Sequence, residues 1–484
     1  MSRTAIIVLV IVALGLGATL YFVNQKPRLA GGNGSSPGSS TPTGPAFEVD
    51  TAQVVALTVT EPGGVTRSVY KTPVGGWIYA ELPVTTEPDI GWPVDVSRVR
   101  SALQTLSPIP AAGRSDSITV DDSAPIIELR LADGTVHSLQ VERESVGGNS
   151  LALVDSEQTV LIPSDTVSDI LSQGPESWRL TSPLAGLNSD PSRITIASGN
   201  NRVALAKVEN RWTIRGPISA RADEVMIRSL LSELAKMRIS EFTDSTNLVT
   251  DPVVTFEVER DDVVSSDGSA RRVTRRVFSI GGAITPGGPL RRATVRGTDL
   301  PPATAMIIER GGISTDEQFI KLAEPEIYIT KHPLHERRED IGIILFRPIG
   351  NMDAERGFRR DLEGWNEMNR DGGMRTAELP DRDALDQAIT MLTTETGTPR
   401  IASEVDHFRP LTRVELYTLD GSDLGSLQVG YTDGVVSVRR GTVLWLYPET
   451  IAPSMFMLPA PDQIEPEPER VPSGAGGANP QGNK

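Results

Sequence analysis

The sequence contains no cysteine and only four histidines among its 484 residues. A chain without cysteine forms no disulfide, thiolate metal site, iron–sulfur cluster or cysteine nucleophile. Gly281-Gly282 and Gly287-Gly288 lack the GK[ST] ending of a phosphate-binding loop. The formal net charge of −16 makes binding to nucleic acid phosphates unfavourable. These absences exclude many enzyme classes, and no remaining pattern specifies a reaction.

One long uncharged segment stands near the N-terminus, at residues 4–23. Twenty residues in a helix rise about 30 Å, which matches the hydrocarbon core of a bilayer. Tyr21 and Lys26 suit the interface and headgroup depths at its end. We therefore expect a single-pass anchor in the inner (cytoplasmic) membrane, with the N-terminus cytoplasmic and the bulk of the chain periplasmic or extracytoplasmic. A secretory signal peptide, cut near Gly17 or Thr19, is the alternative.

Composition changes along the chain predict its division into domains. A length of 484 residues favours two to four domains, and a hydrophobic content of 38% excludes a wholly disordered protein. Residues 31–46 are rich in glycine, serine and proline, as in a flexible tether, and the C-terminal end is rich in proline, glutamate and glycine. The predicted segments are an anchor at 1–25, a linker at 26–46, repeat domains at 47–175, 176–335 and 336–456, and a disordered tail at 457–484.

The body contains a motif that occurs three times. Each copy opens with an alternating strand, at residues 54–60, 192–198 and 341–347, and a second strand then leads to a tryptophan. These tryptophans are Trp77, Trp212 and Trp365. Carbohydrate platforms are one interpretation of such residues. Their equivalent places in three repeats favour structural anchors, each buried against the helix of its own repeat.

An amphipathic helix follows each tryptophan. In the second copy, Asp223 is placed as an N-cap or first-turn acid, and apolar residues including Leu230 and Leu234 recur at three- and four-residue steps. Asp95 begins the first helix, and Asp381 or Asp383 the third. Strands and hairpin turns then resume in each copy. The predicted fold class is α+β, an N-terminal transmembrane helix followed by three related repeats of antiparallel strands packed with one amphipathic helix.

The order of strand, GGW, proline, Ala-Asp, a leucine-rich helix and a strand of the VTFEV kind resembles the domain of unknown function 4340 family. The second copy, from Ile194 to about Gly312, is the closest to this pattern. The resemblance implies tandem repeats in a bacterial envelope protein that is anchored by one N-terminal helix. It also implies a protein partner, because some members resemble or accompany the auxiliary component of gliding-type ABC transport systems. It carries over no catalytic residue.

Several polar patterns are candidate sites. His332 and His335 form HPLHE with Glu336, a metal-ligand spacing that Pro333 makes unfavourable in a helix. We interpret this segment as a polar connection between repeats. Lone His137 and His407 suit structural roles. The remaining patterns are acidic pairs at 121–122, 261–262 and 339–340, a calcium-like fragment at 419–423, and arginine pairs at 271–272, 275–276, 291–292, 337–338, 359–360 and 439–440.

The leading functional hypothesis is a non-catalytic scaffold or accessory protein of the envelope, without cofactor or metal, whose partner is a protein such as an ABC transporter component. No nucleic acid partner is expected. An envelope ligand-binding module for glycan or peptide is the alternative. A hydrolase with an unrecognised metal site at His332 and His335 is the third hypothesis.

Overall fold

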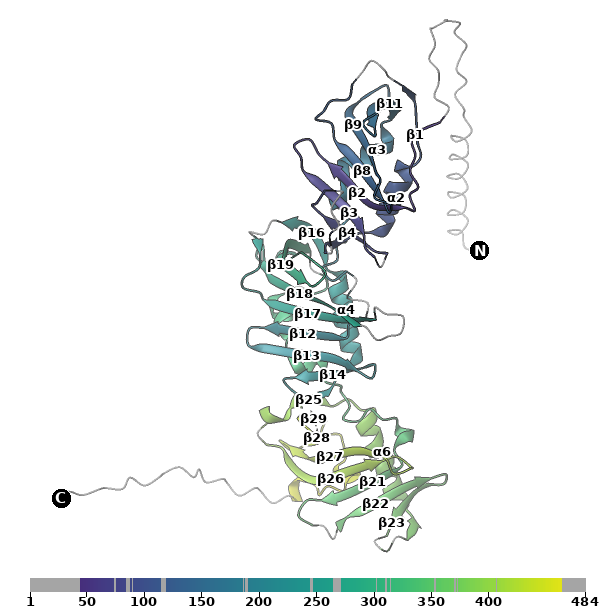
Figure 1. Ribbon diagram of the computed structural model, residues 1–484. Helices are drawn as coiled ribbons and strands as arrows, with labels where there is room; N and C mark the ends of the chain where they lie inside the picture. Colours follow the sequence, from purple (N-terminus) through teal and green to yellow (C-terminus); the bar gives the residue numbers. More distant parts are fainter. Residues whose placement is uncertain are drawn as a thin grey trace, which may run out of the picture.

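The computed structural model describes residues 44–463, apart from gaps at 74, 84–87, 89, 115–118, 186, 188–189, 244–246, 264–270, 302, 310, 314, 352–353, 370, 372 and 406. Three antiparallel sheets of nine strands each follow one another along this part of the chain. Figure 1 shows them as three domains in a row. We call them domain 1 (β1–β11), domain 2 (β12–β20) and domain 3 (β21–β29).

Domain 1 has the sheet order β5-β4-β3-β2-β8-β9-β10-β11-β7. A short separate ladder pairs β1 (Pro45–Phe47) with β6 (Ile109–Pro110). The sheet strands are β2 (Val54–Thr60), β3 (Thr66–Lys71), β4 (Trp77–Ala80), β5 (Trp92–Pro93), β7 (Gly113–Arg114), β8 (Ile126–Leu131), β9 (Val136–Val146), β10 (Asn149–Val154) and β11 (Gln158–Pro163), and the helices are α2 (Val96–Leu106), α3 (Asp165–Gln173) and the 3-10 helix η1 (Pro175–Trp178).

Domain 2 repeats this topology in the order β15-β14-β13-β12-β17-β18-β19-β20-β16. Its strands are β12 (Arg193–Ser198), β13 (Asn201–Val208), β14 (Arg211–Gly216), β15 (Ala220–Arg221), β16 (Arg238–Thr243), β17 (Val254–Val263), β18 (Arg271–Ala283), β19 (Leu290–Gly297) and β20 (Thr304–Glu309). Its helices are α4 (Glu224–Lys236), α5 (Asp316–Lys321) and the 3-10 helix η3 (Pro325–Tyr328), and the 3-10 helix η4 (Arg338–Asp340) precedes domain 3.

Domain 3 has the same topology again, in the order β24-β23-β22-β21-β26-β27-β28-β29-β25. Its strands are β21 (Ile343–Pro348), β22 (Arg356–Asp361), β23 (Gly364–Met368), β24 (Met374–Thr376), β25 (Thr398–Ile401), β26 (Arg409–Tyr417), β27 (Asp423–Thr432), β28 (Val435–Arg440) and β29 (Val443–Leu446). Its helices are α6 (Leu379–Thr393) and the 3-10 helices η6 (Ala402–Glu404), η7 (Pro453–Phe456) and η8 (Pro461–Gln463). No α-helix separates β29 from η7 among these described residues, unlike α3 and α5 in the other domains.

The predicted fold class is wrong, because the described chain is mainly β rather than a balanced α+β fold. Sequence periodicity located the longer strands, but edge strands such as β5 and β15 contain only two residues, too few for an alternation signal. The predicted transmembrane helix at residues 4–23 lies outside the described residues. None of the helices that the structure describes is long and apolar enough to cross a membrane.

Each domain is held together by burial of one helix face against its sheet. In domain 2, α4 buries Ile227, Leu230 and Leu234, and the sheet contributes Trp212 and Ile214 to the same apolar core. The Asp223 carboxylate begins this helix by accepting hydrogen bonds from the backbone N–H groups of Val225 (2.8 Å) and Met226 (3.3 Å). Buried residues of all three domains form one continuous cluster, so the domains also pack on one another.

Candidate functional site

The candidate site is built from backbone hydrogen bonds at the edges of the sheets. The N–H of Asp95 donates to the carbonyl of Trp178 (2.8 Å), and the N–H of Leu180 donates to the carbonyl of Pro93 (2.9 Å). The chain leaving domain 1 therefore runs antiparallel along the end of β5, with Val94 and Arg179 as a bridge pair. We call residues 178–180 the first exit strand.

The chain leaves domain 2 in the same way. The N–H of Asp223 donates to the carbonyl of Tyr328 (2.7 Å), and the N–H of Thr330 donates to the carbonyl of Arg221 (3.4 Å). Ala222 and Ile329 form the equivalent bridge pair. We call residues 328–330 the second exit strand. In both cases a short edge strand is paired on one side within its own sheet, and the chain that leads to the next domain pairs with its open side.

Each exit strand is also fixed to the domain that follows. Thr181 accepts a hydrogen bond from the N–H of Ile239 in β16 (2.6 Å), and Lys331 accepts one from the N–H of Gly397 before β25 (3.0 Å). Indole N–H groups complete both junctions, from Trp92 to the carbonyl of Leu180 and from Trp445 to that of Thr330, each at 2.8 Å. Figure 1 accordingly shows β4 beside β16, and β14 beside β25.

Aromatic side chains surround Arg179 at the first junction. Its guanidinium carbon lies 4.9 Å from the ring centroid of Tyr79 in domain 1 and 3.7 Å from that of Phe242 in domain 2. Trp92 meets Phe242 edge to face, with centroids 5.2 Å apart. Burial lowers the pKa of Arg179 and raises that of the Tyr79 hydroxyl. The junction is therefore a closed, largely apolar contact.

The equivalent edge of domain 3 has no exit strand among the described residues. Thr376 occupies the position in domain 3 that Pro93 and Arg221 occupy in domains 1 and 2. Each of these residues pairs with the residue that follows the tryptophan of its own domain, in the pairs Asn366–Thr376, Ile78–Pro93 and Thr213–Arg221. The residue after η7, Met457, adopts a left-handed conformation (φ 55°), unlike Arg179 after η1 (φ −54°) and Ile329 after η3 (φ −70°). Residues 374–376 are exposed.

The histidines of the HPLHE segment do not converge. The His332 ring nitrogen Nδ1 lies 3.0 Å from the backbone carbonyl oxygen of Glu395. His335 is mostly buried, and desolvation together with the nearby Arg221 and Arg440 lowers its pKa to about 3. The neutral imidazole is the form that binds metals, but the adjacent guanidinium groups would repel a metal cation. Within the described residues, no three His, Asp or Glu side chains gather as a metal-binding group.

The other polar candidates have local roles. Nδ1 of His137 lies 3.0 Å from the carboxylate of Asp155, and His407 is exposed in a turn. Asp121 accepts hydrogen bonds from the backbone and hydroxyl of Ser123, and Asp420 accepts one from the N–H of Ser422. Both carboxylates therefore serve as turn residues.

The arginine pairs are divided between the surface and the interior. Arg276 is 3% exposed, bonds the carboxylate of Asp299 at 2.7 Å and donates to the carbonyl of Ala185 at 2.7 Å. Arg291 is buried, pairs with Asp316 and stacks on Phe319. Arg275 is exposed and pairs with Glu257. No pattern in the sequence indicates that two arginines of this series lie in the interior of domain 2.

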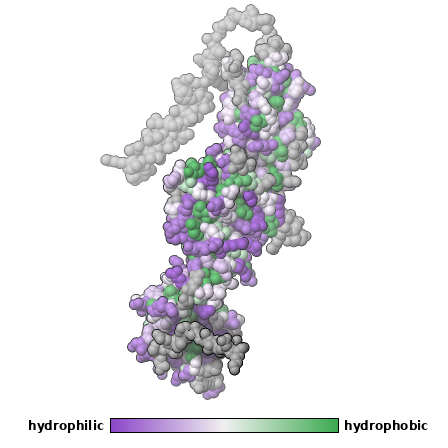
Figure 2. Space-filling model, turned by 90° about the vertical axis from the view of Figure 1, so that its left-hand side faces the viewer, coloured by the Kyte–Doolittle hydropathy of each residue, from purple (hydrophilic) through white to green (hydrophobic). Residues whose placement is uncertain are grey.

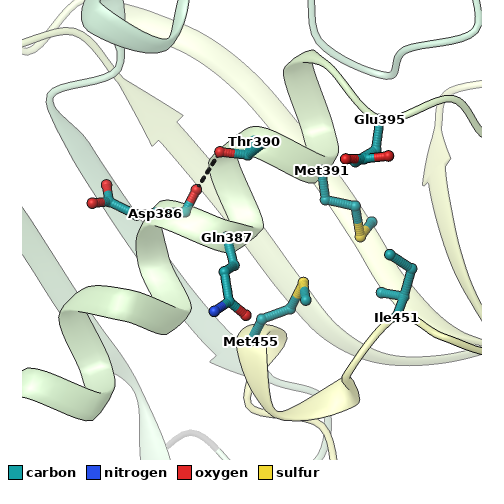
Figure 3. A pocket seen from close by; sticks show the side chains of 7 residues that line it. All are labelled: Asp386, Gln387, Thr390, Met391, Glu395, Ile451 and Met455. Atoms are coloured by element: carbon teal, nitrogen blue, oxygen red, sulfur yellow. Dashed lines mark hydrogen bonds between the residues drawn. The ribbon is translucent and has the colours of Figure 1, made fainter.

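Described residues of domain 3 line two of the cavities in the structure. One, of about 290 Å³, lies between α6 and η7, where Met391, Met455 and Ile451 supply apolar walls and Asp386, Gln387, Thr390 and Glu395 polar ones (Figure 3). The other, of about 560 Å³, lies beside β24 and is lined by Glu339, Arg359, Arg360, Asp361, Leu362, Asn366, Met374 and Leu419. In the view of Figure 2, hydrophobic residues are otherwise scattered among hydrophilic ones.

The sequence-predicted anchors lie at equivalent places in the three sheets. Trp77, Trp212 and Trp365 are 8%, 6% and 2% exposed, at or near the start of β4, β14 and β23. Leu230 and Leu234 are buried on α4, whereas Val225 on the same helix is 64% exposed. Sequence reasoning missed the exit strands, because pairing such as Pro93 with Leu180 joins residues far apart along the chain.

Residues 85–253 match DUF4340, a domain of unknown function. This match confirms the family resemblance that the sequence pattern indicated. It begins ahead of α2 in domain 1 and ends ahead of β17 in domain 2, so it spans the first junction rather than one structural domain. It does not show that the DUF4340 domain is repeated in tandem. No curated protein matches the chain.

Proposed function

We propose that this DUF4340 protein is a non-catalytic scaffold or accessory protein on the extracytoplasmic side of the cytoplasmic membrane. In this proposal the uncharged residues 4–23 attach the chain to the membrane. The glycine- and serine-rich residues 31–46 form the flexible tether that lets the domains extend away from it. A gliding-type ABC transport system is the partner that the family resemblance suggests.

The observation that carries this proposal is the serial construction of the two junctions. Each exit strand is hydrogen-bonded to the domain it leaves, and the following residue is bonded to the domain it enters. Hydrogen bonds on both sides, with buried aromatic contacts at the first junction, favour a fixed row of domains over independent beads. A fixed row of sheets provides a long surface on which a protein partner can bind.

The test is purification of the full chain from its native membranes in mild detergent. We expect a stable complex that contains further envelope proteins in a fixed ratio. Recovery of the free monomer alone, under conditions that preserve other membrane complexes, would contradict the accessory role.

The ligand-binding alternative has one observation in its favour, the cavity beside β24. Its volume of about 560 Å³ is in the range of small-molecule sites, and it combines two arginines with exposed apolar side chains. Titration calorimetry with cell-wall glycan fragments and short peptides tests this alternative. Saturable heat that Arg359→Ala abolishes would favour it over a purely structural surface.

A further inference from the structure

We propose that the outer edge of β24 in domain 3 binds an extended segment of a partner protein by strand addition. The binding groups are the backbone carbonyl of Thr376 and the backbone N–H of Glu378. The inference deepens the proposed scaffold role by naming its contact surface, and it rests on that role for the existence of a partner.

The two junctions show which groups such an edge uses. In domain 1 the carbonyl of Pro93 and the N–H of Asp95 bond the first exit strand. In domain 2 the carbonyl of Arg221 and the N–H of Asp223 bond the second. Thr376 and Glu378 are the third pair in this series.

The groups of the third pair point away from their own sheet. The N–H of Ala377 bonds the carbonyl of Trp365, as the N–H groups of Val94 and Ala222 bond the carbonyls of Trp77 and Trp212. Because hydrogen bonding alternates along a strand, the flanking Thr376 and Glu378 direct their backbone groups outward. No described segment bonds these outward groups. Unpaired edge groups of this kind are a template for a further strand.

The side chains at this edge favour a single extended segment over another whole domain. At the first junction, Tyr79 and the neighbouring Trp92 form an apolar surface that packs on domain 2. Their counterparts in domain 3 are Glu367 and Arg375, which form an ion pair, and Glu367 also bonds Arg356 at 2.8 Å. A second copy that docked domain against domain would have to bury this ionic group without compensation.

The same register defines the chemistry of the segment. The residue opposite Ala377, which is 4% exposed, takes the place of Ile329 or Arg179, so a β-branched residue or an arginine suits this position. The next residue must not be proline, because its N–H donates to Thr376. Beyond it, the segment passes Met374, which is 54% exposed, and the 560 Å³ cavity, where apolar side chains gain contacts with Leu362.

Photo-crosslinking in the native cell tests this surface, with p-benzoylphenylalanine replacing Met374 in the full chain. The blocking variant is Glu378→Pro, which removes the outward N–H. Glu378 has φ −64°, the angle that proline requires, and its side chain makes no cap hydrogen bond, so this substitution leaves α6 intact. Glu378→Ala is the matched control, because it removes the same carboxylate and keeps the N–H.

We expect one adduct with another protein, mapped by mass spectrometry to an extended segment, whose yield falls about tenfold in Glu378→Pro and is unchanged in Glu378→Ala. An adduct of two copies of this chain, or one within the chain to residues 464–484, would assign the edge to a different occupant and overturn the proposal. So would no adduct, or equal yields in both variants. A detergent complex that survives Glu378→Pro unchanged would refute this edge while leaving the scaffold role standing.

Discussion

Arg179 offers the sharpest test of whether the domains are rigidly joined. Its guanidinium lies between the rings of Tyr79 and Phe242, 4.9 Å and 3.7 Å from their centroids. A cation over an aromatic ring contributes about 0.5–2 kcal/mol, more when the pair is shielded from water. Two such contacts, less the free-energy cost of desolvating the guanidinium, contribute about 1–2 kcal/mol to the stability of the folded chain. We expect Arg179→Ala to lower the free energy of unfolding by that amount.

Scanning calorimetry of the full chain measures this effect. A loss of about 1–2 kcal/mol should lower the midpoint of the affected transition by about 2–8 °C, if the cooperative unit has domain size. Arg179→Met retains the apolar stem and should lose less. Arg296→Ala, at an exposed arginine of β19, is the control and should change stability by less than about 0.5 kcal/mol. If Arg179→Ala and Arg296→Ala give the same midpoint, the junction is not a stabilising contact.

Three further predictions concern the interior. Asp299→Ala should destabilise domain 2 by about 3 kcal/mol in urea unfolding, because it leaves the buried Arg276 without its carboxylate. The control, Arg275→Ala at an exposed pair, should cost less than about 1 kcal/mol. Equal costs for the two variants would contradict the burial argument. Trp212→Ala should cost about 3–5 kcal/mol and Leu362→Ala almost nothing, since one side chain is buried and the other fully exposed. His335 should stay neutral in NMR titrations between pH 8 and pH 5, because its folded pKa is about 3. Its contribution to stability is therefore present above its unfolded pKa of about 6.5 and is lost as the pH falls toward 3, and a titration midpoint near 6.5 in the folded chain would refute this.

Local sequence signals predict the features that are determined by residues close together in the chain. The tryptophan after each hairpin and the aspartate that caps α4 were both predicted, because side-chain alternation and capping depend on neighbours a few residues away. The third helix was harder. It begins at Leu379 with a proline in its first turn, so Asp381 lies inside the helix and bonds Arg356 rather than capping the N-terminus.

The features that distant residues determine were not predictable in this way. The short edge strands owe their existence to pairing with β4, β14 and β23, not to their own pattern. Burial of Arg276 depends on Asp299 and on the carbonyl of Ala185, 91 residues away along the chain. A charged side chain is expected on the surface unless such partners are known, and a single sequence does not reveal them.

The ionic edge of domain 3 differs in chemistry from the edges of domains 1 and 2 among the described residues. Domains 1 and 2 end in edges that the next domain covers, and at the first of these a tyrosine and a tryptophan are buried by the contact. In domain 3 the same register holds Glu367, whose pKa Arg356 lowers through a hydrogen bond, and Arg375. Charges that are satisfied within one edge remove the hydrophobic gain from docking another sheet, but they leave the outward backbone groups of Thr376 and Glu378 accessible. Side chains at this edge therefore oppose close docking of another sheet, while its backbone still favours an added strand.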